Sequence, residues 1–314
     1  MDVITLGETM VMLVATEAGP LRAIEMFRKH VAGSESNVAI GLARLGHRPG
    51  WISRLGQDEF GAYIRNFLRG EGIDVSQVIF DPNYPTGIAF KERRELGPRR
   101  VIYYRRGSAA SHLTPSDLNP EYFAGVRFFH FSGINPALSA SCHETVLAAI
   151  DLAHQTGAVV TFDPNVRLRL WDVDTCRRTL RGIIPHCDIV LPGADEAELL
   201  TGESDPERAA RELHNMGPRL VLMKLGAAGS MALGDDGIVR VPAIHLDRIV
   251  DPVGAGDGFA AGFLSGQLRG WTVEESLRLG NTVGACAMTV SGDVEGLPTW
   301  EEVQEFDSTR DVAR

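Results

Sequence analysis

The segment DPVGAGDGFAAGF, residues 251–263, combines a glycine-rich turn with one carboxylate among the glycines. The backbone N–H groups of Gly254, Ala255 and Gly256 would point outward at the positive end of the helix that follows, and they would form an anion hole suited to phosphate. Asp257 cannot bind the same anion. It can act as a general base that takes a proton from a hydroxyl attacking phosphorus, or it can merely favour the helix N-terminus electrostatically.

Two common nucleotide-binding motifs do not fit the chain. No Gly-Lys-Ser/Thr sequence follows the turn, so it is not a Walker A loop. The turn also lies far from the first strand, and that strand, in ITLGETMVML, lacks the glycine fingerprint of a dinucleotide-binding fold. A nicotinamide-dependent oxidoreductase is therefore not indicated.

The elements expected to position this turn alternate between apolar strands and amphipathic helices, which indicates a parallel sheet covered on both faces. In the helix expected over 34–46, Val38, Leu42 and Leu45 recur at helical spacing, and Ser34 is the expected N-cap. Further strands are expected near 2–8, 50–56, 126–133, 158–165, 187–193 and 219–226, and further helices near 58–72, 141–157, 195–202 and 205–217.

Polar residues follow several of the predicted strands, among them Glu8, Asn135, Asp163, Asn165 and Lys224. Ligands of open parallel sheets lie past the C-terminal ends of the strands, so the sequence predicts a binding site at this edge. Turn chemistry explains part of the same pattern, and Asp163 is assigned no role.

Two segments interrupt the alternation. Residues 11–32 form an expected irregular insertion, and residues 86–106 resemble a β-hairpin around a Gly-Pro turn. We expect both to build a small β-lid over the sheet edge, within a single domain that spans residues 1–314. Lys91, Arg93, Arg94, Arg99 and Arg100 near the hairpin tip are expected to be exposed to solvent.

The bulk properties restrict the function. The net charge of −10 argues against a nucleic-acid binder, but it leaves room for a small anionic ligand in a local basic pocket. The four cysteines have no CxxC spacing, so they indicate buried thiols of a cytoplasmic protein and no zinc or redox pair. No signal peptide and no apolar run long enough for a membrane span is seen, so no membrane partner is expected.

Residues 251–263 resemble the C-terminal signature of the PfkB/ribokinase family of sugar kinases. The segment AGSESNVAIGLARLGHRPGWISRLG, residues 32–56, resembles the N-terminal signature of that family. Its residues at the characteristic spacings are Gly33, Asn37, Ala39, Gly46 and Gly56. Ala32 and Glu35 depart from the usual residues, whereas GQDEFG at 56–61 also matches. The resemblance extends from Gly7 to about Pro298.

The resemblance implies a ribokinase-like three-layer αβα sandwich, with a mostly parallel central sheet and a small β-sheet lid. It implies transfer of the ATP γ-phosphoryl group to a sugar hydroxyl, with Asp257 as the general base and the N–H groups of Gly254, Ala255 and Gly256 stabilising the transferred charge.

The nucleotide side of the site follows from the same resemblance. Lys224, Gly226 and Gly229 in KLGAAGS match the nucleotide-binding turn, and Asn281 matches an asparagine near the adenine. The family's N-x-x-E metal motif retains Glu196 and has Gly193 in place of asparagine. Mg²⁺ beside ATP phosphates needs few protein ligands, so Glu196 is the one metal-site residue expected. Activation by a monovalent cation is left open.

The substrate side is rich in arginine. Tyr103 and Arg105 would share one face of a lid strand, and Arg167 follows another strand. A planar guanidinium binds a carboxylate through two parallel hydrogen bonds, so the cluster predicts a sugar acid. Two alternatives remain: Arg105 on a solvated face, and Arg167 paired with Asp172.

The segments YYR, HFSGI, DPNVR and GDVEG look like those of 2-keto-3-deoxygluconate kinases within the family. That likeness implies sugar-acid contacts from six residues: Gly33, Asn37, Tyr103, Arg105, Arg167 and Asp293. Some such kinases carry a tyrosine where this chain has Ala89. The expected reaction is ATP-dependent phosphorylation of 2-keto-3-deoxygluconate to 2-keto-3-deoxy-6-phosphogluconate. The alternatives are a fructokinase, a 5-dehydro-2-deoxygluconokinase, or a catalytically silent sugar sensor.

The lid is also the expected contact for a homo-oligomer, because an exposed hairpin protects its edge by pairing with a second subunit. Ile88, Phe90, Val101 and Tyr103 alternate along the two hairpin arms and are the expected contact residues.

Overall fold

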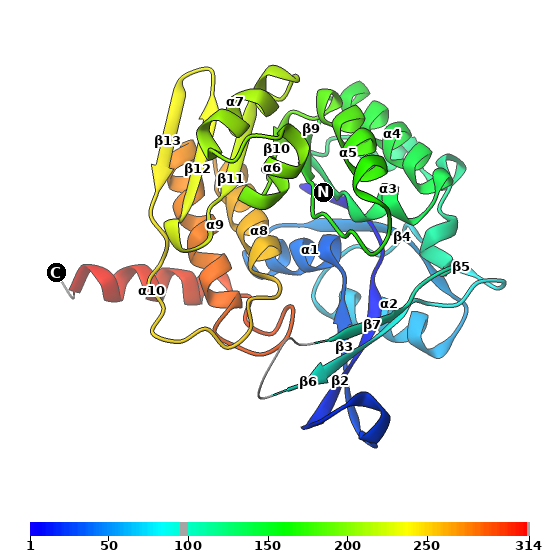
Figure 1. Cartoon of the computed structure of the whole chain (residues 1–314). Coiled ribbons are helices and arrows are strands. Elements are labelled where there is room, and N and C mark those ends of the chain that lie inside the picture. Colours follow the sequence, from blue (N-terminus) through cyan, green and yellow to red (C-terminus); the bar gives the residue numbers. More distant parts are fainter. Residues whose placement is uncertain (95–99, 313–314) are drawn as a thin grey trace.

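The computed structural model describes residues 1–94 and 100–312, and within this part of the chain two sheets and the helices around the larger one are seen (Figure 1). The larger sheet has nine strands in the order β13-β12-β11-β10-β9-β8-β1-β4-β5. Its strands are β1 (Val3–Leu6), β4 (Pro49–Gly56), β5 (Val78–Asp81), β8 (Phe128–Ser132), β9 (Val159–Asp163), β10 (Ile189–Val190), β11 (Leu220–Lys224), β12 (Ser230–Gly234) and β13 (Gly237–Val241).

All neighbours from β11 to β5 pair in parallel, and only β12 and β13 add antiparallel strands at the edge. The central strands are buried along their length because helices cover both faces. The mostly parallel αβα sandwich expected from the resemblance is thus confirmed.

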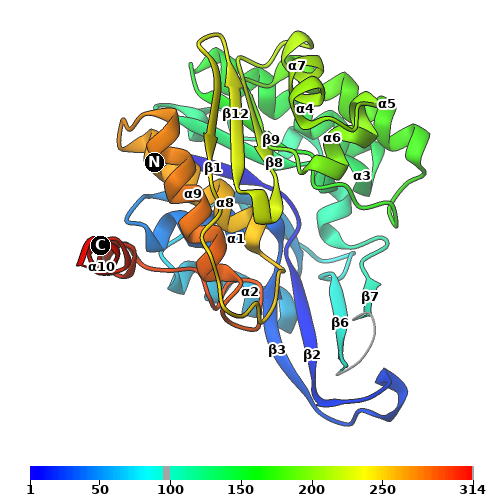
Figure 2. The same ribbon diagram turned by 60° about the vertical axis from the view of Figure 1, so that its left-hand side comes forward.

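Two helical layers enclose this sheet (Figures 1 and 2). One apolar core joins the sheet to the layer of α3 (Ile134–Leu138), α4 (Ala140–Gln155), α5 (Val173–Ile183), α6 (Ala194–Thr201) and α7 (Pro206–Asn215). Two further apolar clusters join the opposite face to α1 (Ser34–Arg44), α2 (Glu59–Gly70), α8 (Ala255–Leu268), α9 (Val273–Ala287) and α10 (Trp300–Val312). No helix in the described ranges is long and apolar enough to span a bilayer.

The smaller sheet projects from the edge where the parallel strands end (Figure 1). Its order is β3-β2-β6-β7, from β2 (Met10–Ala18), β3 (Phe27–Ala32), β6 (Ile88–Arg93) and β7 (Val101–Tyr104). Residues 11–32 are therefore not irregular: they form two paired strands, because Met10–Ala15 register antiparallel to Phe27–Ala32. The hairpin of β6 and β7 forms as expected, and its Gly-Pro turn lies outside the described residues.

The pairing register separates the two faces of this lid. Ala89 pairs with Tyr103 and Lys91 with Val101, so these four residues share the inner face. Ile88 pairs with Tyr104 and Phe90 with Ile102, which places them on the outer face. Val101 and Tyr103 are thus not on the same face as Ile88 and Phe90, contrary to the expected set of oligomer contacts.

Some local expectations are wrong. Gly33, not Ser34, is the N-cap of α1, and the Ser34 hydroxyl is directed to another partner described below. The sequence patterns also did not predict several elements that complete the layers: α5, α9, α10, β12 and β13.

Candidate active site

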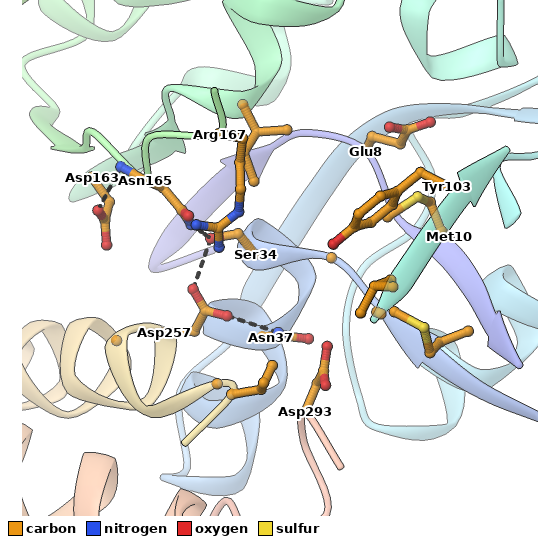
Figure 3. A pocket seen from close by; sticks show the side chains of 18 of the residues that line it. Glu8, Met10, Ser34, Asn37, Tyr103, Asp163, Asn165, Arg167, Asp257 and Asp293 are labelled. Atoms are coloured by element: carbon orange, nitrogen blue, oxygen red, sulfur yellow. Dashed lines mark hydrogen bonds between the residues drawn. The ribbon is translucent and has the colours of Figure 1, made fainter. Parts of the chain in front are cut away.

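A cavity of about 390 Å³ lies between the carboxyl ends of the parallel strands, the start of α8 and the inner face of the lid (Figure 3). Most of the predicted site residues line it: Gly33, Asn37, Tyr103, Arg105, Arg167, Glu196, Lys224, Gly254, Gly256, Asp257 and Asp293. The remaining predicted residues, Ala255, Gly226, Gly229 and Asn281, line a second cavity next to it. Lys224 and Gly256 line both, so the two cavities meet at the glycine turn.

Asp257 lies in the first turn of α8 and is held by α1. Asn37 Nδ2 and Ser34 Oγ each donate to its carboxylate at 2.7 Å, and Asn165 Nδ2 donates to Ser34 Oγ at 2.8 Å (Figure 3). Burial raises the pKa of Asp257 to about 6, and the two donated hydrogen bonds oppose that rise. Near pH 7 the carboxylate is therefore ionised, oriented and ready to accept a proton.

The glycine turn approaches its neighbours closely. Gly254 has φ of 82°, a left-handed conformation that favours glycine, and a Cβ there would lie 2.3 Å from the Asp293 carbonyl oxygen. Because α8 begins at Ala255, the N–H groups of Ala255, Gly256 and Asp257 lie in the first turn, which lacks intrahelical partners. The Ala255 N–H also makes a long contact of 3.4 Å with the Pro252 carbonyl.

Gly33 is a second point of close approach. A Cβ on Gly33 would lie 2.6 Å from the Glu8 carbonyl oxygen and 2.7 Å from Thr9 Oγ1. A larger residue at this position, where β3 meets α1, would therefore clash with the backbone of Glu8 and the side chain of Thr9.

Arg105 does not lie on a solvated face. Its Nε donates to Glu8 Oε2 at 2.6 Å, and Ser108 Oγ donates to the other carboxylate oxygen. The Glu8 side chain is fully buried. The sequence placed Glu8 at a strand end, but its pairing with Arg105 was not predicted because the two residues are far apart in the chain. The positive charge of Arg105 is thus compensated by the protein itself.

Arg167, unlike Arg105, is not paired with a carboxylate among the described side chains. It follows β9, is exposed, and makes only a 3.3 Å hydrogen bond to the Val166 carbonyl, with no ion-pair partner among the side chains described for 1–94 and 100–306. Asp172, the alternative partner, accepts from the Thr175 N–H and caps α5. The Arg167 guanidinium points toward Ser34 and Asp257 (Figure 3). It is a cation that lines the cavity without an ion-pair partner among the described side chains.

Lys224 lies where the two cavities meet. Its Nζ contacts Asp163 Oδ2 at 2.7 Å, so Asp163, to which the sequence gave no role, orients the lysine. Burial alone would lower the pKa of Lys224, but the carboxylates of Asp163 and Glu196 outweigh burial and raise it. Lys224 therefore stays charged beside the glycine turn.

The second cavity has a volume of about 470 Å³ and is mostly apolar. The turn of Gly226 and Gly229 forms one wall, and residues 243–246 and 249 form another. Asn281 Nδ2 donates to the carbonyls of Val241 and Pro242 at 3.3 and 3.0 Å, which ties α9 to the start of that wall. An apolar cavity of this volume beside the glycine turn can take a heterocycle whose phosphates would reach that turn.

Glu196 is a weak candidate for direct metal ligation. Its Oε2 accepts from the Gly193 N–H at 2.7 Å, and its Oε1 accepts from the Val166 N–H at 2.8 Å. No group of three or more potential ligands is seen in the described part of the chain. These residues fit a hydrated Mg²⁺ held through water, and not a fully protein-coordinated ion.

Lys91 is buried, so the expectation that it is exposed to solvent is wrong. It is 7% exposed, and its Nζ contacts Asp251 Oδ2 at 2.8 Å and lies 3.9 Å from Asp293 Oδ1. Burial raises the pKa of Asp293 to about 6, and the Lys91 ammonium opposes the rise. A lid residue thus contacts both the segment that begins the glycine turn and the loop that follows α9. Arg99 lies outside the described residues.

A comparison with known families decides the class of protein. The model of the pfkB family of carbohydrate kinases matches residues 1–300. The chain belongs to the PfkB family of carbohydrate kinases. Its relatives include the 2-dehydro-3-deoxygluconokinase of Bacillus subtilis (strain 168), 41% identical over 98% of this chain and 95% of the relative. The 2-dehydro-3-deoxygluconokinase of Thermoproteus tenax is 37% identical over 97% of this chain and 94% of the relative.

Solved structures place this PfkB-family kinase in the same fold. A PfkB protein from Polaromonas sp. JS666 is 42% identical, with a TM-score of 0.89 over 96% of this chain and 99% of that chain. A putative ribokinase II from E. coli, in complex with ATP and Mg²⁺, is 27% identical, with a TM-score of 0.91 over 98% of this chain and 99% of that chain. The family assignment made from the two signatures is confirmed.

Proposed function

We propose that this PfkB-family kinase phosphorylates 2-keto-3-deoxygluconate, also called 2-dehydro-3-deoxygluconate, at the expense of ATP, and that it releases 2-keto-3-deoxy-6-phosphogluconate. The observation that carries the proposal is Arg167, an uncompensated guanidinium that faces the general base across the cavity. A cation in that position selects a substrate with a carboxylate. The names of the relatives described above support the same substrate.

The residues of this chain have defined roles in the proposed reaction. Asp257 accepts the proton of the 6-hydroxyl while that oxygen attacks the γ-phosphorus of ATP, and the bond from that phosphorus to the bridging oxygen breaks so that ADP leaves. The N–H groups of Gly254, Ala255 and Gly256 and the Lys224 ammonium stabilise the charge on the transferred group. ATP lies with its base in the second cavity, against Gly226, Gly229 and Asn281.

The sugar acid lies on the lid side. Arg167 holds its carboxylate, Tyr103 and Gly33 shape the cavity, and Asn37 and Asp293 are within reach of hydroxyl groups. Arg105 contributes through its unpaired guanidinium N–H groups while Glu8 keeps it in place. Glu196 would hold a hydrated Mg²⁺ through water, and the ion would supply neutralisation of the phosphate charge.

A substrate panel tests the proposal. Initial rates are measured with 2-keto-3-deoxygluconate, 5-dehydro-2-deoxygluconate, fructose and ribose as acceptors, with Arg167→Gln beside the wild type. Loss of one charged bidentate contact costs about 1.5–3 kcal/mol, so kcat/KM for the acid falls about 10- to 150-fold while poor neutral acceptors are unaffected. Equal kcat/KM for fructose and the acid in the wild type contradicts the proposal.

A further inference from the structure

A third cavity, of about 820 Å³, adjoins the candidate active site between β7 of the lid, α3 and the loop that follows β9. The two cavities share the lining residues Val101, Tyr103, Arg105 and Arg167. The third cavity lies within the range of about 300–1,000 Å³ that is usual for small-molecule sites, and it is more than twice as large as the active-site cavity of about 390 Å³. The proposed reaction gives this space no role.

The third cavity carries positive charge on both of its walls. Its described lining residues include no aspartate or glutamate but four arginines, Arg105 and Arg106 on the lid side and Arg167 and Arg169 in the loop after β9. Only Arg105 has a carboxylate partner, Glu8, among the side chains that the structure describes. In a chain with a net charge of −10, three guanidinium groups around one cavity thus lack an ion-pair partner in the described part of the chain.

Much of the remaining wall is apolar. It includes Leu138 of α3 and Val166, Leu168 and Leu170 of the loop after β9. Leu168 is 49% exposed, so a ligand that covered it would remove apolar surface from water. Cations beside an apolar wall suit a ligand that joins an anionic group to an apolar body.

One hydrogen bond ties the two walls of this cavity together. Arg169 Nη1 donates to the Val101 carbonyl at 2.7 Å, which fixes the loop after β9 against β7. A guanidinium has several N–H donors, so Arg169 keeps others for a ligand. The site is therefore built from both the lid and the sheet edge.

We propose that this third cavity binds a small organic acid whose carboxylate is attached to an apolar body, and that the bound acid competes with the sugar substrate. A planar guanidinium binds a carboxylate through two parallel hydrogen bonds, and the volume leaves room for the apolar body beside the leucines. Because Arg167 and Tyr103 also line the active-site cavity, an acid paired with Arg167 withdraws that guanidinium from the sugar. Binding of the acid does not depend on which sugar is phosphorylated.

Calorimetry with 2-naphthoate as the probe tests binding without turnover. Titrations are run at constant ionic strength with a saturating non-hydrolysable ATP analogue, which keeps the naphthyl ring out of the apolar nucleotide cavity. We expect one naphthoate per chain. The neutral 2-naphthamide lacks the charge and acetate lacks the apolar body, so each should bind at least about tenfold more weakly, which is about 1.4 kcal/mol. Absence of naphthoate binding, or equal binding of either control compound, overturns the proposal.

Matched variants locate the site. Arg106 lines the third cavity but not the active-site cavity, and Arg106→Gln should weaken naphthoate binding by about tenfold. Leu168→Gln should also weaken it, because the apolar contact is lost. Arg211→Gln removes the same charge from an exposed position on α7, outside the cavity, and should leave binding unchanged. Undiminished binding by Arg106→Gln or Leu168→Gln, or an equal loss in Arg211→Gln, overturns the proposal.

Inhibition kinetics test the competition. Naphthoate should raise the KM of the wild type for its sugar linearly with concentration and leave kcat unchanged. Arg106→Gln should need about tenfold more naphthoate for the same rise, the factor by which its binding is weakened. A KM that bound naphthoate leaves unchanged overturns the competition, whatever the acceptor sugar proves to be. A wild type that turns over only neutral sugars contradicts the proposed function and leaves the calorimetric test of the third cavity intact.

Discussion

At the scale of single residues, Asp257 combines a pKa near 6 with two hydrogen bonds that orient its carboxylate. The base must be ionised to accept a proton, so we predict that kcat/KM falls as the pH drops through about 6 and levels off above it. Ser34→Ala removes a bond to the ionised form, so the acid limb should move to higher pH. A pH series of kcat/KM for both proteins measures this.

The same carboxylate should be essential for turnover. We predict that Asp257→Ala folds normally but loses about 10³-fold or more in kcat, as expected for removal of a general base. Single-turnover kinetics and the unfolding midpoint check the two parts separately. An active, stably folded Ala variant contradicts the role of Asp257 as the base.

Arg105 and Glu8 form a buried pair, and their mutations should not be additive. Arg105→Gln leaves the Glu8 carboxylate buried without its cation, so we predict a loss of about 3–5 kcal/mol in the free energy of unfolding. The double variant Glu8→Gln/Arg105→Gln should recover part of that loss, because no unpaired charge remains. Urea unfolding of the four proteins in this cycle measures it, and strictly additive losses contradict the pairing.

At the scale of elements, α1 carries a buried acid, Glu35, next to Ser34 of the candidate active site. Glu35 accepts from the Ser132 N–H at 3.0 Å, and its other oxygen is buried with no partner among the described residues. Burial raises its pKa from 4.5 to about 7. The acid is therefore protonated in the fold at pH values where it is ionised in the unfolded chain.

This raised pKa predicts a specific pH dependence. The stability conferred by Glu35 is complete below pH 4.5, decreases as the pH rises to about 7, and changes little above that. The loss amounts to about 3 kcal/mol at most. Glu35→Gln cannot ionise, so its advantage over the wild type should grow between these pH values. Glu212→Gln, exposed on α7, is the matched control, and a constant difference contradicts the prediction.

At the scale of the whole molecule, the outer face of the lid presents an apolar surface. Phe90 contacts Phe27 and Tyr104 through edge-to-face ring pairs, and Ile102 and Tyr104 are 44% and 65% exposed. β3 and β7 are the edges of this sheet. We propose that a second copy of the chain covers this face, because identical edges and faces pair readily about a two-fold axis.

Analytical ultracentrifugation tests that assembly. We predict that the wild type sediments as an oligomer and that Ile102→Lys sediments as a single chain, since a lysine charge opposes burial of this face. Val173→Lys, at an exposed apolar position on α5, should keep the wild-type mass. A monomeric wild type contradicts the proposal.

The sequence by itself determined the family, the parallel sheet and most of the residues around the active site. Those conclusions rest on short-range patterns: glycines at fixed spacing before α8, apolar strands alternating with helices, and polar residues directly after strands. The prediction of Asp257 as the base rests on the glycine turn and the family resemblance, and Arg167 was expected at the sheet edge because it directly follows a strand.

Only the tertiary structure decided which charged side chains are paired within the protein and which remain available to a ligand. Glu8 neutralises Arg105, Asp163 orients Lys224, and Asp251 holds Lys91, although each pair is separated by many residues in the chain. The lid faces were likewise assigned only by pairing register, because a shift of one residue exchanges the inner and outer faces. Composition cannot distinguish a compensated arginine from a free one, since compensation depends on which distant carboxylate the fold brings within about 3 Å.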